Sequence, residues 1–171
     1  MVERSGPLLG ALVVTLPVTV WPAYVFLSFD HDVVYIVASA QSGLAVNAAS
    51  AVFMLIYLVM AQTRGLVFSL LVAVFSWIGL AWLLLSVTWT VVCAGLLNLL
   101  VYPVCLWLSR NFREVEVPRV ARQWYELPLR TALVCALMGT VLVLSHWVGP
   151  KATGMLAVYP ISTTCTMLIL H

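Results

Sequence analysis

Long apolar runs separated by short polar segments make up almost the whole chain. The hydrocarbon core of a bilayer is about 30 Å thick, and a helix needs about 20 apolar residues to cross it. Measured against that length, the pattern predicts an all-α polytopic transmembrane bundle of about six spans that forms a single domain over residues 1–171. The expected spans are 7–29, 33–60, 66–85, 88–108, 127–148 and 154–171. A cytoplasmic loop, 109–126, joins the fourth span to the fifth.

Two of these runs are too long for one straight crossing. Residues 33–60 would extend about 42 Å as a helix, so this span must tilt, break or protrude from the bilayer. The uncharged stretch 66–108 would extend about 65 Å, about twice the bilayer core, and must fold back on itself. The turn is expected near Ser86, Thr88 and Thr90, because β-branched and hydroxyl residues weaken a helix there.

Composition supports a chain surrounded by lipid. Hydrophobic residues make up 64% of the sequence and charged residues 8%, whereas a soluble domain has about 25% charged residues. The formal charge of +2 is too small for nucleic-acid binding, and no segment mixes dense basic residues with aromatics. The four cysteines lie inside apolar runs without CxxC spacing, which is typical of small hydrophobic side chains. The expected partner is therefore the lipid bilayer, with no nucleic acid.

The basic residues gather on one side of the predicted topology. Short loops rich in arginine and lysine stay cytoplasmic. With six alternating spans both termini are cytoplasmic, as in a multi-pass protein of a bacterial-type inner membrane, and Lys151 lies outside. If the chain did not turn back between the third and fourth spans, every later loop would lie on the opposite side of the membrane. That topology would divide the basic residues between the two sides, so the six-span topology is preferred. The cytoplasmic group is Arg4, Arg64, Arg110, Arg113, Arg119, Arg122 and Arg130.

The two ends of the chain share a pattern that predicts an inverted repeat. Gly6-Pro7 followed by Pro17 and Thr19 matches Gly149-Pro150 followed by Pro160 and Ser162 at a constant offset. An odd number of spans separates the two starts, so the copies would cross the membrane in opposite directions. The match is short, and Gly-Pro is common at helix starts. If the repeat is real, the functional protein contains further spanning helices, supplied by a longer chain or by a second copy.

Neutral polar residues collect in the second span. Ser39, Gly43, Asn47 and Ala51 recur every four residues and share one helix face, next to Gln41. One interpretation is close packing of helices over small residues, with Asn47 bonded across the contact. The other is that Gly43 interrupts the helix, so that backbone carbonyls and the Gln41 and Asn47 amides line a polar cavity.

Prolines inside the first and sixth spans mark a second group of candidates. Pro17, Pro22 and Pro160 each remove a backbone donor and free a carbonyl. The hydroxyls nearby could satisfy those carbonyls, or could bind a neutral solute or a cation. These hydroxyls belong to Thr15, Thr19, Ser162, Thr163, Thr164 and Thr166.

Charged side chains offer little for catalysis. Asp30, His31 and Asp32 could ligate a metal, but three adjacent residues seldom converge on one ion, and a solvated turn is the simpler interpretation. Arg130 lies near a span end, where it can extend to the interface or bind an anion. No hydrolase, metalloprotease, Walker or dinucleotide motif occurs in the sequence. We therefore expect neither an enzyme nor a cofactor or metal site.

Two functions remain. The first is a transporter or permease unit for a small polar solute, with its site between the first, second and sixth spans. The alternative is a noncatalytic membrane subunit that scaffolds or stabilises a larger membrane complex, since small-residue faces also serve subunit packing. The expected protein partners are a second copy of the chain or the other subunits of such a complex. The predicted solute-binding residues are Thr15, Pro17, Thr19, Gln41, Gly43, Asn47, Pro160, Ser162 and Thr163.

Overall fold

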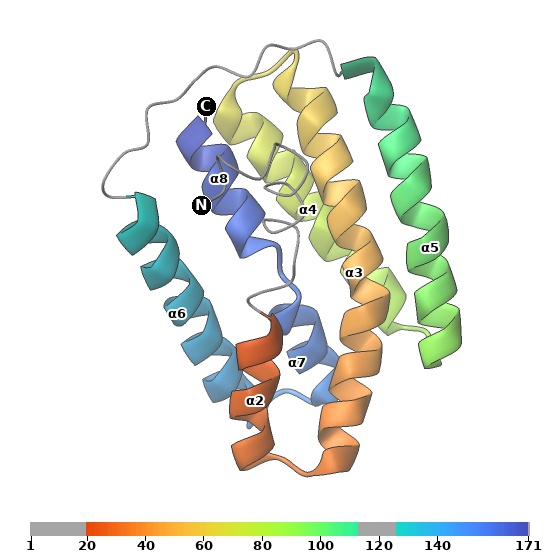
Figure 1. The fold of residues 1–171 in the computed structure, drawn as a ribbon, viewed down its shortest axis with the longest axis vertical. Coiled ribbons are helices and arrows are strands. Elements are labelled where there is room, and N and C mark those ends of the chain that lie inside the picture. Colours follow the sequence, from red (N-terminus) through yellow and green to blue (C-terminus); the bar gives the residue numbers. More distant parts are fainter. Residues whose placement is uncertain (1–19, 113–125, 171) are drawn as a thin grey trace, which may run out of the picture.

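The structure is a computed structural model that describes residues 20–112 and 126–170. All regular elements in those two ranges are helices. From α2 to α6 each long helix runs opposite to the one before it, and α7 and α8 then follow one another back along the bundle (Figure 1). The elements are α2 (Val20–Asp30), α3 (Val33–Ala61), α4 (Leu66–Leu85), α5 (Val91–Leu108), the 3₁₀ helix η2 (Ser109–Phe112), α6 (Glu126–Ser145), α7 (Pro150–Ala157) and α8 (Ile161–Leu170).

The second, third and fourth predicted spans correspond closely to α3, α4 and α5. The turn predicted inside the uncharged stretch is confirmed, because α4 ends at Leu85 and α5 begins at Val91. The fourth span begins later than residue 88 because Thr90 is the N-cap of α5, and its hydroxyl accepts a bond from the Cys93 amide at 3.3 Å. Trp89 strengthens the turn by donating from Nε1 to the Leu84 carbonyl at 2.7 Å.

The last two predicted spans differ from the structure at their ends. Helix α6 stops at Ser145, and the next helix already begins at Pro150, because proline suits the first turn of a helix. The expected single helix over 154–171 is instead two helices, α7 and α8, separated by residues 158–160. Of the first predicted span the structure describes α2, and residues 7–19 lie outside the described part.

The main core lies between α3 and α4. Small and large side chains alternate along α4, where Ala73, Trp77 and Ala81 recur every four residues and so share one face. That face packs on Val46, Ala49 and Phe53 of α3, and all six residues are buried. The Trp77 indole also donates to Ser50 Oγ at 3.3 Å and meets the Tyr159 ring edge-on at 5.1 Å. Tyr159 lies in the segment that connects α7 to α8, so this contact holds the connecting segment against the core.

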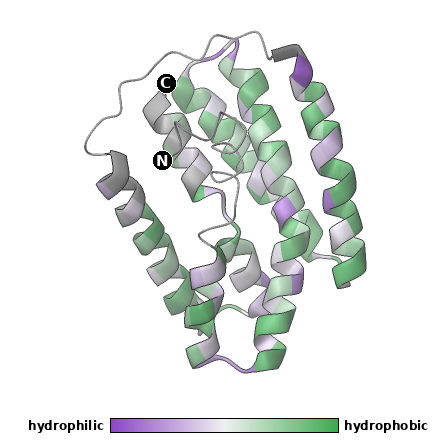
Figure 2. Cartoon of the chain, in the orientation of Figure 1, coloured by the Kyte–Doolittle hydropathy of each residue, from purple (hydrophilic) through white to green (hydrophobic). Residues whose placement is uncertain are grey.

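The outward faces of the helices are apolar. Trp82 and Trp21 are each 77% exposed, and Figure 2 shows hydrophobic residues over most of the length of the long helices. A water-soluble protein seldom exposes apolar patches of this extent. Within the described residues three helices, α3, α4 and α5, are long and apolar enough to cross a membrane. The described part of the chain is therefore all-helical, with three helices that could span a membrane.

The polar turn between α2 and α3 is fastened to the end of α6. Asp32 is the N-cap of α3 and accepts a bond from the Tyr35 amide at 3.0 Å. His31 stacks on the Tyr35 ring at 3.9 Å, and its Nε2 is 2.8 Å from Ser145 Oγ. Among the described residues, no group of three or more His, Cys, Asp or Glu side chains could hold a metal.

Tyr35 makes the most connections at this end of the bundle. Its hydroxyl lies 2.9 Å from the Ser145 carbonyl, 3.1 Å from the Val148 carbonyl and 2.7 Å from Thr153 Oγ1. It therefore links the start of α3 to the α6–α7 connection.

Replacing Tyr35 with phenylalanine is expected to lower the free energy of unfolding by about 1–3 kcal/mol, because these oxygens lose a partner where water has little access. Equilibrium unfolding in mixed micelles measures the loss. Tyr57→Phe is the matched control on the same helix, because no described residue hydrogen-bonds to the Tyr57 hydroxyl. An equal effect of the two substitutions would contradict the role of the Tyr35 hydroxyl.

Candidate functional site

The neutral polar residues of the second span lie on an unbroken helix. Helix α3 continues from Val33 to Ala61 without interruption, so the interpretation in which Gly43 breaks the span is wrong. A glycine inside a helix costs only about 1 kcal/mol relative to alanine, which neighbouring turns and packing can offset. Gly43 instead allows a close approach, since an added Cβ would lie 3.0 Å from Tyr24 Oη and 3.1 Å from Val158 Cγ2.

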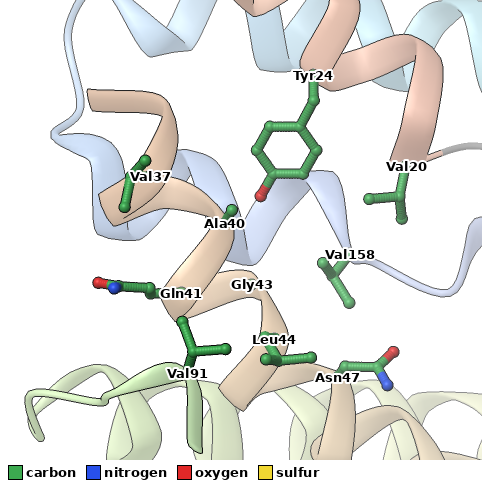
Figure 3. Close-up of a pocket in the computed structure, with 10 residues that line it drawn as sticks. All are labelled: Val20, Tyr24, Val37, Ala40, Gln41, Gly43, Leu44, Asn47, Val91 and Val158. Atoms are coloured by element: carbon green, nitrogen blue, oxygen red, sulfur yellow. The ribbon is translucent and has the colours of Figure 1, made fainter. Parts of the chain in front are cut away.

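A cavity of about 470 Å³ opens beside this part of α3. It lies between α2, α3, the start of α5 and the gap between α7 and α8, and Figure 3 shows its walls. Gln41, Gly43 and Asn47, three of the residues predicted from the sequence, all line it. The described residues that line it are Val20, Tyr24, Val37, Ala40, Gln41, Gly43, Leu44, Asn47, Val91 and Val158.

Tyr24 separates this cavity from the tightest helix contact. Figure 3 shows its hydroxyl directed toward Ala40 and Gly43 of α3. Tyr24 Oη and the neighbouring Ser39 Oγ are both buried and have no hydrogen-bond partner of acceptable geometry in the described structure. The ring of Tyr24, and not its hydroxyl, therefore forms the cavity wall. Tyr24 was absent from the sequence prediction, because an aromatic residue inside an apolar run reads as part of the hydrophobic surface.

Asn47 is held by a polar network that crosses to α5. Asn98 Nδ2 donates to the Leu44 carbonyl at 2.7 Å and to the Ala94 carbonyl at 2.8 Å, which fixes the orientation of its amide. Its Oδ1 then accepts from Asn47 Nδ2 at 2.9 Å, and Tyr102 Oη is 3.1 Å from the same nitrogen. Both hydrogens of the Asn47 amide are thus used, and its Oδ1 remains as an acceptor.

Sequence reasoning missed Asn98 and Tyr102. One signal was available, because Asn98 is the sole amide side chain in the uncharged stretch 66–108. Its partner could not be named, because the rotation of α5 about its axis depends on packing against α3.

The network predicts an asymmetric response to mutation. Asn98→Leu is expected to reduce the free energy of unfolding by about 1–3 kcal/mol, because the Asn47 amide loses an acceptor at low dielectric. Adding Asn47→Leu is expected to restore part of that stability, because no unpaired amide remains. A double-mutant cycle of unfolding free energies measures the coupling. Strictly additive losses would contradict the network.

The sixth span is broken at the proline that the sequence identified. Pro160 cannot donate to the Leu156 carbonyl, and the Tyr159 amide donates to that carbonyl at 3.2 Å instead. The Val158 amide turns back in the same way to the Met155 carbonyl at 3.2 Å. The Tyr159 amide is therefore a backbone partner for the carbonyl that the proline leaves free. Thr164 Oγ1 bonds to the Pro160 carbonyl itself at 2.9 Å.

The remaining predicted residues fall into two groups. Pro160 follows Val158, a residue of the cavity wall, by two positions, and Ser162 and Thr163 lie in the first turn of α8. Thr163 is not among the described residues that line the cavity. Thr15, Pro17 and Thr19 lie outside the described residues. The structure thus unites the second-span candidates with the break in the sixth span.

Contact between α3 and α7 holds this arrangement in place. An added Cβ on Gly154 would overlap the Ser39 carbonyl oxygen and would lie 2.6 Å from Ser42 Oγ. Backbone therefore meets backbone at this crossing, as the predicted face of small residues on α3 requires. Comparison with protein-family models, with curated proteins and with solved structures finds no match to this chain.

Proposed function

We propose that the chain is a transporter or permease unit for a small polar solute, not an enzyme, and that the cavity beside Gln41 and Asn47 is its solute site. The observation that carries the proposal is the position of this cavity against the break between α7 and α8. Discontinuous helices near the bilayer midplane are a common way to build solute sites in transporters.

The proposed topology has about six spans in a bacterial-type inner membrane, with cytoplasmic termini. The arrangement of the helices supports it, because the α3–α4 turn with Arg64 and the η2 segment with Arg110 lie at one end of the bundle (Figure 1). The start of α7, with Lys151, lies at the other end together with the α2–α3 turn. This segregation agrees with the retention of arginine-rich loops in the cytoplasm.

The inverted repeat belongs to the same proposal. In the proposed second copy, Gly149-Pro150 opens α7, and Pro160 lies in the break between α7 and α8. A second protein copy or further helices would then complete the transport unit. Crosslinking in native membranes measures whether two copies associate, and a flux assay on the separated species measures whether a single copy transports. A fully active monomer of six helices would contradict the repeat.

A proteoliposome flux assay tests transport. The full chain is reconstituted, folding is confirmed by circular dichroism, and entry of a panel of radiolabelled polyols, amides, amino acids and ions is compared with empty vesicles. We expect saturable flux of at least one uncharged polar solute. Folded protein without flux of any solute would contradict the proposal.

One observation favours the second function, a noncatalytic subunit of a membrane complex. Ala94 is the single fully buried residue of α5, so nearly all of this apolar helix faces outward. Partner helices could cover that surface as well as lipid can. Purification in mild detergent followed by mass spectrometry separates the two functions. Stoichiometric foreign subunits would support the complex, whereas self-association alone supports the transporter.

A further inference from the structure

The described walls of the cavity beside α3 contain hydrogen-bonding groups but no charge. None of the described lining residues is acidic, basic or histidine, and most of them are valine, alanine and leucine. An ion moved from water into such surroundings loses several kcal/mol of solvation unless an opposite charge compensates it. The composition of the wall therefore disfavours a charged ligand.

Charged groups at the cavity's end of the bundle have roles elsewhere in the fold. Asp32 is the N-cap of α3, and α3 itself contains no charged residue. Lys151 Nζ lies 3.5 Å from the Leu85 carbonyl and lines a separate cavity with Trp82. A counter-charge for a bound ion is thus missing from the described walls.

The backbone carbonyls at the break between α7 and α8 are not left free to coordinate a cation. The Met155 and Leu156 carbonyls accept bonds from the Val158 and Tyr159 amides, and the Tyr159 carbonyl accepts from the Ile161 amide at 2.7 Å. These oxygens already have partners within the turn. Coordination of a metal cation would have to compete with those bonds.

Two amide side chains supply the polar recognition. Asn47 offers Oδ1 as an acceptor, because both of its amide hydrogens are used by Asn98 and Tyr102. The Gln41 amide has no hydrogen bond to any described residue, so it can both donate and accept. Figure 3 shows the two side chains on either side of Gly43 and Leu44, with their amide groups directed away from one another, so a single polar group of a solute would bond to one of them.

We infer that the cavity binds an uncharged amphipathic solute, with a hydroxyl or amide group bonded to Asn47 or Gln41 and a compact hydrocarbon part against the valines. This deepens the proposed transport function by naming the class of solute. Recognition of this kind is common in ligand pockets, where apolar walls supply affinity and a few polar groups fix orientation. Binding can be measured whether or not transport follows.

Probes of equal shape and different charge test the inference. Choline has an uncharged isostere, neohexanol (3,3-dimethylbutan-1-ol), in which a quaternary carbon replaces the nitrogen. The matched anion is 3,3-dimethylbutanoate, the carboxylate of tert-butylacetic acid, called tert-butylacetate below. Isothermal titration with the full chain in nanodiscs, against empty nanodiscs, is expected to show saturable binding of neohexanol. Choline and tert-butylacetate are expected to bind at least about tenfold more weakly. Glycerol, in which every carbon carries a hydroxyl group, is also expected to bind more weakly than neohexanol.

A charge-changing variant tests the placement of the site. Gln41→Arg puts a permanent positive charge at the cavity edge, and we expect tert-butylacetate to gain about tenfold in affinity relative to neohexanol. Gln62→Arg is the matched control, because Gln62 is exposed in the α3–α4 turn away from the cavity. Equal gains in both variants would overturn the assignment of Gln41.

The results separate the inference from the proposed function. Choline or tert-butylacetate binding as tightly as neohexanol to the wild-type protein would overturn the uncharged class, even if flux occurs. Failure of all four probes to bind folded protein would overturn the inference in the same way. Neohexanol bound to a protein without flux of any solute would support the ligand class and contradict transport.

Discussion

Gly154→Ala is expected to destabilise the folded protein by about 3 kcal/mol, although the change adds one methyl group. That methyl group would overlap the backbone carbonyl of Ser39. A backbone atom inside a helix cannot rotate away as the end of a flexible side chain can. The α3–α7 crossing would have to separate, and with it the wall of the cavity. Equilibrium unfolding in mixed micelles, followed by far-ultraviolet circular dichroism, measures the effect.

Gly79 provides the control for this substitution. It lies on α4 with nothing within 4 Å of an added Cβ. Gly79→Ala is therefore expected to be neutral or to stabilise the helix by up to about 1 kcal/mol, because alanine loses less backbone entropy on folding. Glycine-to-alanine changes in α7 and in α4 should thus have clearly different effects on the free energy of unfolding. Unchanged stability of Gly154→Ala would contradict the close crossing.

Ala40→Phe is expected to reduce transport at least tenfold while the protein stays folded. Ala40 lies on the exposed side of α3 and lines the cavity, so a phenyl ring there occupies solute space without overpacking the core. The loss corresponds to about 1.4 kcal/mol or more of binding or barrier energy. Initial rates in proteoliposomes, with any solute that the wild-type protein carries, measure the change.

Leu83→Phe is the matched variant for the transport measurement. Leu83 is 64% exposed on α4 and lies outside the cavity, so a larger apolar side chain there should leave the flux unchanged. Normal flux through Ala40→Phe would place the solute path elsewhere. Equal inhibition by both variants would point to a general effect on the bilayer or on assembly.

Local chemistry in the sequence was sufficient to predict most of the helix boundaries. The ends of α3 and α4 lie within one residue of the prediction, whereas α5 begins three residues later than expected and the sixth span is divided into α7 and α8. The residues responsible, Thr90 as a cap and Pro160 as a missing amide, act within a few residues of themselves. The face of small residues on α3 was also predicted from its spacing, and Gly154 lies directly against it. The number of spans and the inverted repeat stay predictions.

Features that depend on which helices meet could not be predicted. Asn98 reaches Asn47 only because α5 packs on α3 with one particular rotation. The error at Gly43 has a related cause, since a glycine that breaks a helix and a glycine that admits a neighbour look identical in sequence. Tyr24 is part of the cavity because α2 returns beside the middle of α3. Burial alone would not have distinguished it from the other aromatic residues.

Cysteine reactivity tests the central claim, that the cavity beside α3 admits water and solute from outside the lipid. The four native cysteines are replaced with alanine, and single cysteines are introduced by Ala40→Cys and Leu83→Cys. N-ethylmaleimide reacts with the thiolate, which forms only where water reaches the sulfur. In proteoliposomes we predict rapid labelling of Ala40→Cys and slow labelling of Leu83→Cys. Equally slow labelling of the two folded variants would contradict a solute cavity at this position.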